Sequence, residues 1–160
     1  MTIDQLKELI STQSPMFQDK LQLRLSSLTS ALQELEDFQF TSWTSNTIAQ
    51  IIDIWCLSDF VADATSRFPE LLVELIDSGD LNSVYDDDSL QFRLVNKLEN
   101  VDSEEALIRS LRMFRRREMV RIVWRDMLKL STMEETTRDM SFLAAQTIDQ
   151  ALTWLHNDCC

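Results

Sequence analysis

Residues 111–126 hold the side chains of this chain that are best suited to binding charge. The stretch Leu-Arg-Met-Phe-Arg-Arg-Arg-Glu-Met-Val-Arg-Ile-Val-Trp-Arg-Asp is rich in arginine, although the chain has a formal net charge of −12. A guanidinium is planar, always charged and able to bind carboxylates or phosphates with two parallel hydrogen bonds. The candidate docking or anion-binding patch therefore consists of the arginines of this stretch: Arg112, Arg115, Arg116, Arg117, Arg121 and Arg125.

The helical period mixes these charges with apolar residues. At 3.6 residues per turn, Arg115, Glu118, Arg121 and Arg125 fall on one side of a helix, together with apolar residues. A helix without a clean solvent face is covered on more than one side, which predicts a central bundle helix in which Glu118 neutralises Arg115 and Arg121. The apolar residues on that side are Leu107, Leu111, Phe114 and Ile122, and those on the opposite side are Met113, Val120 and Trp124.

Two interpretations of the arginines remain open. They form an internal ion-pair network, or they bind the phosphates or carboxylates of a ligand or partner. The need to pair buried charges favours the first. Nucleic acid is not expected as a partner, because the chain has 27 acidic against 15 basic residues and presents no exposed platform of stacking aromatic residues.

The composition predicts an all-α fold. One glycine and two prolines leave few turns for a sheet, whereas helix-forming residues are abundant. A length of 160 residues with 44% hydrophobic residues fits one domain, residues 1–160, with a proper core. We expect a multi-helix bundle that ends in two long antiparallel helices.

Capping and turn residues predict where the helices lie. A short helix over residues 3–10 precedes a long one that begins at Pro15 after Ser14 and buries a stripe from Phe17 to Leu35. An apolar segment over residues 47–57 follows a connector over residues 40–46. Further helices are expected from Ser58 to Arg67, from Pro69 to Gly79 and after Ser89, the last burying Leu90, Leu94, Val95 and Leu98.

The last two helices are expected to begin with capping boxes. Asp102 and Glu105 have this spacing before the arginine helix, and Ser131 and Glu134 have it before the final helix. The final helix is expected to bury an apolar stripe against its neighbours. The stripe consists of Met140, Leu143, Ala144, Thr147, Ile148, Ala151, Leu152 and Leu155.

No catalytic, cofactor-binding or metal-binding residue is expected in this chain. Asp86, Asp87 and Asp88 are better explained as helix caps before Ser89 than as cation ligands. His156 fits a surface position, and Cys56 fits a buried, inert thiol. Cys159 and Cys160 lack a base and match no disulfide or zinc pattern. No membrane span or signal peptide is present, so we expect a cytoplasmic protein.

Three stretches resemble one family. The arginine-rich stretch is similar to a helix in the amino-terminal region of the bifunctional glutamine synthetase adenylyltransferase and adenylyl-removing enzymes. Ser58 to Val61 followed by Phe68 to Leu72 agree with that region in order and spacing, and so do residues 151–160. The resemblance extends from about Ile52 to Cys160.

The resemblance implies a role in the control of nitrogen assimilation. Family members adenylylate a tyrosine of glutamine synthetase and remove the group by phosphorolysis, using magnesium and ATP or ADP. They respond to the PII signalling protein, and their catalytic aspartates lie in a nucleotidyltransferase domain beyond the matched region. The chain is thus expected to be the helical leader of a larger multi-domain enzyme, inactive alone, and present either as a truncated piece or as a shortened reading frame. The alternative is a free-standing acidic helical interaction module without catalysis.

Overall fold

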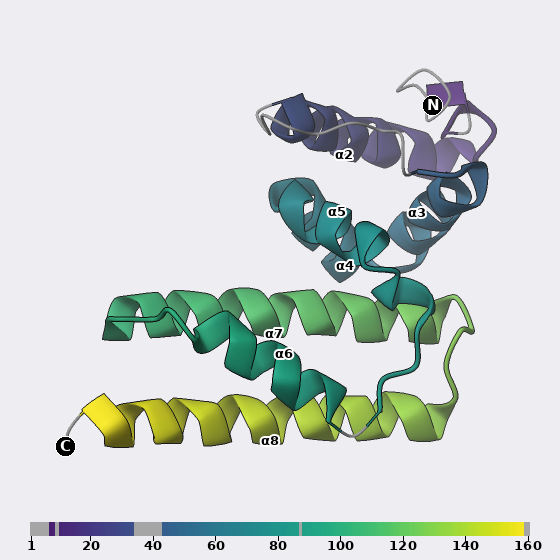
Figure 1. Ribbon diagram of the computed structural model, residues 1–160. Helices are drawn as coiled ribbons and strands as arrows, with labels where there is room; N and C mark the ends of the chain where they lie inside the picture. Colours follow the sequence, from purple (N-terminus) through teal and green to yellow (C-terminus); the bar gives the residue numbers. More distant parts are fainter. Residues whose placement is uncertain (1–6, 9, 34–42, 87, 159–160) are drawn as a thin grey trace.

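The structure, a computed structural model, describes residues 7–158 except residue 9, residues 34–42 and residue 87. Within these ranges the fold is all-α and contains no strand. Figure 1 shows two long antiparallel helices at one side, as the sequence predicted. The labelled elements are α2 (Pro15–Gln33), α3 (Ser45–Leu57), α4 (Asp59–Arg67), α5 (Pro69–Asp77), the short 3₁₀ helix η2 (Asp80–Asn82), α6 (Ser89–Leu98), α7 (Glu104–Met127) and α8 (Met133–Asp158).

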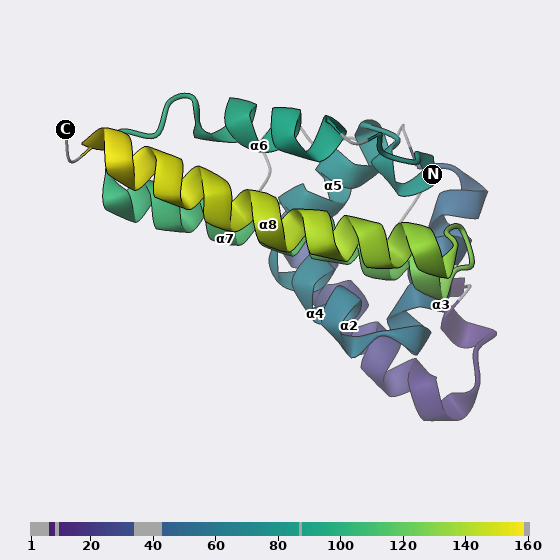
Figure 2. The ribbon, with the colours of Figure 1, turned by 90° about the horizontal axis from the view of Figure 1, so that it is seen from below.

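The helices form two groups that share α7. Helices α2 to α5 pack together on one side of α7, and α6 and α8 pack on its other side (Figures 1 and 2). Helix α7 extends beyond the first group, so its amino-terminal half is covered mainly by α6 and α8. The arginine-rich stretch is therefore a central bundle helix, as its mixed faces predicted.

Each group has its own apolar core. The first is built from α2 to α5 and η2 with Val120 and Trp124 of α7. The second joins α6 and α8 with Leu107, Phe114 and Ile122 of α7. Opposite faces of one helix thus close two cores, which explains why α7 has no continuous polar face.

Most predicted helix boundaries are confirmed. Helix α2 begins at Pro15, Ser58 caps α4 by accepting a hydrogen bond from the Val61 amide, and Pro69 opens α5. Gly79 has φ of +73°, a conformation that glycine adopts without a steric penalty, and it ends the turn after α5. Of the predicted first helix, Ile10 is described and fully buried, whereas Ile3, Leu6 and Leu9 lie outside the described residues.

Three local predictions were wrong. Helix α7 is capped by Ser103, which accepts from the Ala106 amide, rather than by Asp102. The cap before α8 is Thr132, which accepts from Glu135, rather than Ser131, whose hydroxyl is bonded to Thr136. Helix α3 begins at Ser45, inside the predicted connector, because Thr44 caps it through the Thr47 amide.

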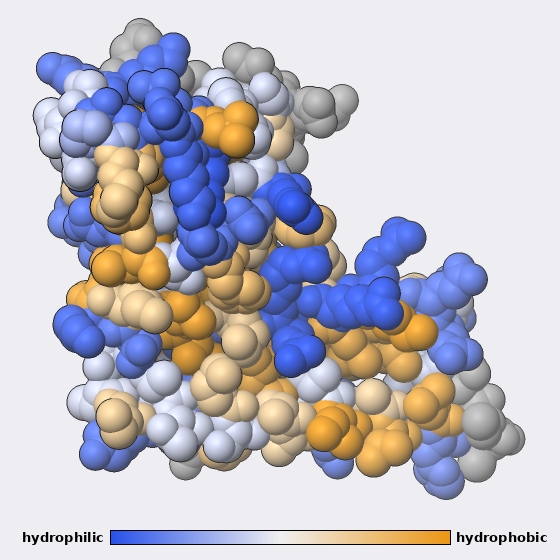
Figure 3. All heavy atoms as spheres, turned by 180° about the vertical axis from the view of Figure 1, so that it is seen from behind, coloured by the Kyte–Doolittle hydropathy of each residue, from blue (hydrophilic) through white to orange (hydrophobic). Residues whose placement is uncertain are grey.

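The predicted buried stripes of α6 and α8 also need correction. Val95 is exposed, while Leu90, Leu94 and Leu98 are buried. Of the predicted α8 stripe, Leu143 alone is fully buried, and Ile148 and Leu152 are each 62% exposed. The side of α8 that faces α7 carries Glu135, Asp139 and Leu143 at four-residue spacing, because the arginines of α7 bind the two carboxylates. This pairing turns the apolar stripe outward, and Figure 3 shows apolar side chains along that edge.

Across the part of the chain that the structure describes, no helix has both the length and the apolar character that crossing a membrane requires.

Candidate functional site

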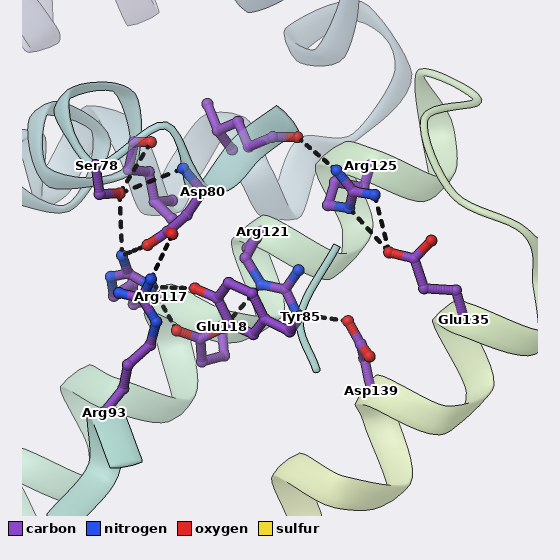
Figure 4. Close-up of polar contacts among 12 residues, drawn as sticks. Ser78, Asp80, Tyr85, Arg93, Arg117, Glu118, Arg121, Arg125, Glu135 and Asp139 are labelled. Atoms are coloured by element: carbon purple, nitrogen blue, oxygen red, sulfur yellow. Dashed lines mark hydrogen bonds and ion pairs between the residues drawn. The ribbon is translucent and has the colours of Figure 1, made fainter. Parts of the chain in front are cut away.

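Three of the candidate arginines lie inside the molecule. Arg117, Arg121 and Arg125 are 6%, 0% and 2% exposed and follow one another at about one turn along α7. Figure 4 shows their guanidinium groups among side chains of several elements. Their position between the two cores removes them from solvent, so each must find its partners within the fold.

Arg117 joins α7 to the segment after α5. Its Nη2 lies 2.5 Å from Oδ2 of Asp80, which is 2% exposed, and its Nε donates to Glu74 at 2.8 Å. It also donates to the hydroxyl of Tyr85 at 3.3 Å and pairs with the neighbouring Glu118. Burial acts to lower the pKa of Arg117, but the charge of Glu118 and hydrogen bonds to Asp80 and Tyr85 outweigh it and raise that pKa. The guanidinium group therefore stays charged, and the carboxylates around it fix its position and balance its charge.

Arg121 joins α7 to α8. Its Nε donates to Glu118 at 2.9 Å, and its Nη2 donates to Asp139 of α8 at 2.5 Å. Its guanidinium carbon lies 3.6 Å from the centre of the Tyr85 ring. The guanidinium carbon of Arg93 lies 4.8 Å from the same ring centre. Glu118 is fully buried between Arg117 and Arg121, so it accepts from both and holds the centre of the network.

Arg125 fastens the turn between α7 and α8. It donates to Glu135 from Nε and Nη2, at 3.2 and 2.8 Å. Its remaining hydrogen bonds go to the carbonyl oxygens of Leu81 at 3.1 Å and Leu130 at 3.0 Å. One side chain therefore connects η2, the α7–α8 turn and the first turn of α8.

Burial and charge shift the pKa values of two further groups in the network. Burial acts to raise the pKa of Asp80, but hydrogen bonds from Arg117 and Ser78 and the charges of Arg117 and Arg93 more than offset it, so that pKa is lowered. Burial, with the charge of Glu118, raises the pKa of Tyr85 to about 12. The network thus holds Asp80 as a carboxylate and Tyr85 as a neutral phenol at neutral pH.

The other candidate arginines lie nearer the surface. Arg112 and Arg115 are exposed, and neither forms an ion pair or side-chain hydrogen bond with another described residue. Arg116 is half-buried, and its guanidinium carbon lies 4.0 Å from the centre of the Phe68 ring. We call Arg112, Arg115 and Arg116 the outer arginines, and Arg117, Arg121 and Arg125 the inner arginines.

The sequence predicted one ion pair of this network and placed one residue wrongly. Glu118 does pair with Arg121, but Arg115 points to solvent and Arg117 takes the predicted place beside Glu118. Asp80, Tyr85, Glu135 and Asp139 were missed. The last two had a readable signal, because Glu135 and Asp139 are four residues apart, as are Arg121 and Arg125, and antiparallel helices align such pairs. Asp80 and Tyr85 lie between Gly79 and Ser89, a stretch without a helical period that could have placed their side chains.

Where the structure describes them, the remaining candidates are a helix-cap residue, a surface residue and a half-buried thiol. Asp86 accepts from the amide of Ser89 at 2.9 Å, as expected for a cap, and Asp87 lies outside the described residues. His156 is exposed. Cys56 is half-buried, with its pKa raised by burial and by the charge of Asp53, while Cys159 and Cys160 are not described. Within the described ranges no three histidine, cysteine or acidic residues gather where they could hold a metal ion.

Comparison with known proteins identifies the class to which this helical arrangement belongs. The family model described as glutamate-ammonia ligase adenylyltransferase matches residues 48–160. Bifunctional glutamine synthetase adenylyltransferase/adenylyl-removing enzymes are similar over most of the chain. The enzyme of Pseudomonas aeruginosa is 35% identical over 136 residues, or 85% of this chain and 14% of the relative. Those of Nitrosococcus oceani and Hahella chejuensis are 38% and 34% identical, over 72% and 87% of this chain and 12% and 15% of the relatives.

The chain belongs to the glutamate-ammonia ligase adenylyltransferase family. It spans between 12% and 15% of the length of these three relatives. The matched region includes α7 with all the inner and outer arginines.

Proposed function

We propose that this chain is the helical leader of an enzyme that adenylylates glutamine synthetase and removes the adenylyl group. The proposal is supported by family membership and by the names of the relatives, which state both activities. Glutamine synthetase is then the protein substrate, and the PII protein is a regulatory partner of the parent enzyme. The leader does no chemistry by itself.

Magnesium and ATP or ADP belong to the parent enzyme in this proposal. The described helices do not fit either requirement, since no cluster of possible metal ligands is present among them and the sole glycine of the chain cannot form a phosphate-binding loop. In this proposal both are bound by the nucleotidyltransferase domain that follows this region in the family. The helices support or position that domain.

The observation that carries this role is the division of the arginines on α7. The inner arginines are paired with carboxylates of this chain, so their charges are already balanced within the fold. Arg112 and Arg115 have no partner among the described residues, and Arg116 is held against Phe68. We propose that the outer arginines dock the nucleotidyltransferase domain in cis or reach its phosphate-bearing ligand, because exposed guanidinium groups bind either kind of oxygen acceptor.

An activity comparison tests the parent function. Adenylylated glutamine synthetase is incubated with phosphate and magnesium, together with either this chain or the same chain extended through its downstream reading frame. Release of the adenylyl group by the extended chain alone supports the proposal. Inactivity of both proteins, or the lack of a downstream frame, would favour the free-standing interaction module.

A further inference from the structure

A second charged surface of the molecule is a groove between α5, α6 and the first half of α7, which shares Glu74, Arg93 and Arg117 with the ion network. Its volume is about 720 Å³. Its lining residues come from all three helices, and Figure 1 shows α6 crossing obliquely beside α7, below α5. Concave sites of this size are common binding sites for apolar side chains or ligands.

The groove has an apolar floor. Leu71 of α5 and Met113 and Phe114 of α7 line it, and so does Phe92 of α6. Phe92 is 68% exposed, so an occupant that covered it would remove a large apolar side chain from water. The floor therefore favours an occupant that brings apolar side chains of its own.

The charges at the groove are unevenly placed. Lys97 of α6 and Arg109 of α7 line it, are exposed, and form no ion pair or side-chain hydrogen bond with described residues. On the α5 side, Glu74 is already bound by Arg117, while Glu70 lies nearby. An occupant with carboxylates toward α6 and α7 and without carboxylates toward Glu70 would complement this arrangement.

We propose that this groove binds an acidic amphipathic helix of a separate partner protein. An apolar stripe of that helix covers Phe92 and Met113, and its flanking carboxylates pair with Lys97 and Arg109. Such helix-in-groove binding combines apolar anchors at helical spacing with charges at the edge. Nucleic acid fits less well, because its charge extends past the groove into the field of a chain with net charge −12. The inference does not depend on the proposed adenylyltransferase role.

Fluorescence anisotropy with defined peptides tests this inference. The probes are short labelled helical peptides with leucine and phenylalanine at positions i, i+3, i+4 and i+7, flanked by glutamates in one set and by lysines in the other. We expect this chain to bind the glutamate set, and to bind it less tightly as salt is raised. Lys97→Glu with Arg109→Glu should weaken binding about tenfold, since two exposed pairs become repulsive. Phe92→Ala should weaken it independently.

The control is Arg67→Glu, which makes the same charge change at one exposed residue of α4, outside the groove. It should leave peptide affinity within about twofold of that of the unsubstituted chain. Equal binding of both peptide sets, or an unchanged affinity in the Lys97→Glu/Arg109→Glu variant, would overturn the proposal. So would binding to this chain but not to the extended parent protein, because the groove would then be covered by a later segment of the same protein.

Discussion

At the scale of single residues, the inner arginines connect parts of the chain that are far apart in sequence. Arg117 reaches Asp80 and Glu74, Arg121 reaches Asp139, and the buried Glu118 accepts from both. Buried ion pairs add little net stability because their desolvation is costly, but removing one partner leaves an uncompensated charge. The network therefore specifies how the two groups of helices meet. Removing a charge at its centre lowers the stability of the fold.

Replacing Glu118 with glutamine should strongly destabilise the fold. The change keeps the size of the side chain but removes the charge between Arg117 and Arg121, and we expect the free energy of unfolding to fall by about 3–5 kcal/mol. Urea unfolding followed by tryptophan fluorescence measures this. Glu105→Gln, an exposed change on the same helix, should stay within about 0.5 kcal/mol of the unsubstituted chain. A loss below about 1 kcal/mol for Glu118→Gln would contradict the role of the network.

Asp80 makes the network sensitive to acid. Because its pKa is lowered in the folded state, its stabilising contribution is complete above its ordinary pKa of about 3.9 and is lost as pH falls through the lower folded value. Asp80→Asn should therefore be less stable than the unsubstituted chain by about 3 kcal/mol at pH 7. The difference should shrink below pH 4, as measured by urea midpoints across that range. A difference independent of pH would show that the charge of Asp80 is not what stabilises the fold.

At the scale of helices, the residue that caps α7 in the structure differs from the one that the sequence pattern predicted. Ser103→Ala should cost about 1 kcal/mol, because it removes the acceptor for the Ala106 amide at the start of α7. Asp102→Ala serves as the control, since Asp102 has the capping-box spacing but does not cap the helix. Thermal and urea unfolding of both variants compare them directly. A larger loss for Asp102→Ala would restore the original prediction.

The orientation of α8 gives a second prediction at this scale. Leu143 is 2% exposed and Leu152 is 62% exposed, although both belong to the predicted stripe. Leu143→Ala should lower the free energy of unfolding by about 2–5 kcal/mol, whereas Leu152→Ala should change it by no more than about 0.5 kcal/mol. Similar losses in the two variants would mean that the stripe is buried as the sequence suggested.

These cases show what local pattern could and could not predict. Helix starts at Pro15 and Pro69 and the turn at Gly79 were readable because proline and glycine restrict the backbone at a single position. The buried side of α8 could not be predicted from apolar periodicity alone. Arg121 and Arg125 of α7 pair with carboxylates on the side of α8 that faces them, and the periodicity of α8 does not include these partners. The role of Asp80 could not be predicted either, because its partner Arg117 is 37 residues away and local patterns do not join such distant residues.

At the scale of the whole molecule, α7 has different roles on its different faces. Its inner arginines lie between the two cores, and its outer arginines are exposed or half-buried at the surface. The chain is acidic overall, but the exposed arginines on its central helix form a local positive surface. We propose that this surface contributes to the arrangement of the parent enzyme rather than to the fold of the leader.

The most direct test of this division replaces Arg112 and Arg115 with alanine in the parent enzyme. Rates of adenylylation of glutamine synthetase and of adenylyl removal are measured together with the unfolding midpoint of the leader, and Arg67→Ala, an exposed change on α4, is the control. We predict a loss of at least one activity by about tenfold, corresponding to about 1.4 kcal/mol, with the unfolding midpoint unchanged. Full retention of both activities with an unchanged midpoint would contradict the proposed docking role of the outer arginines.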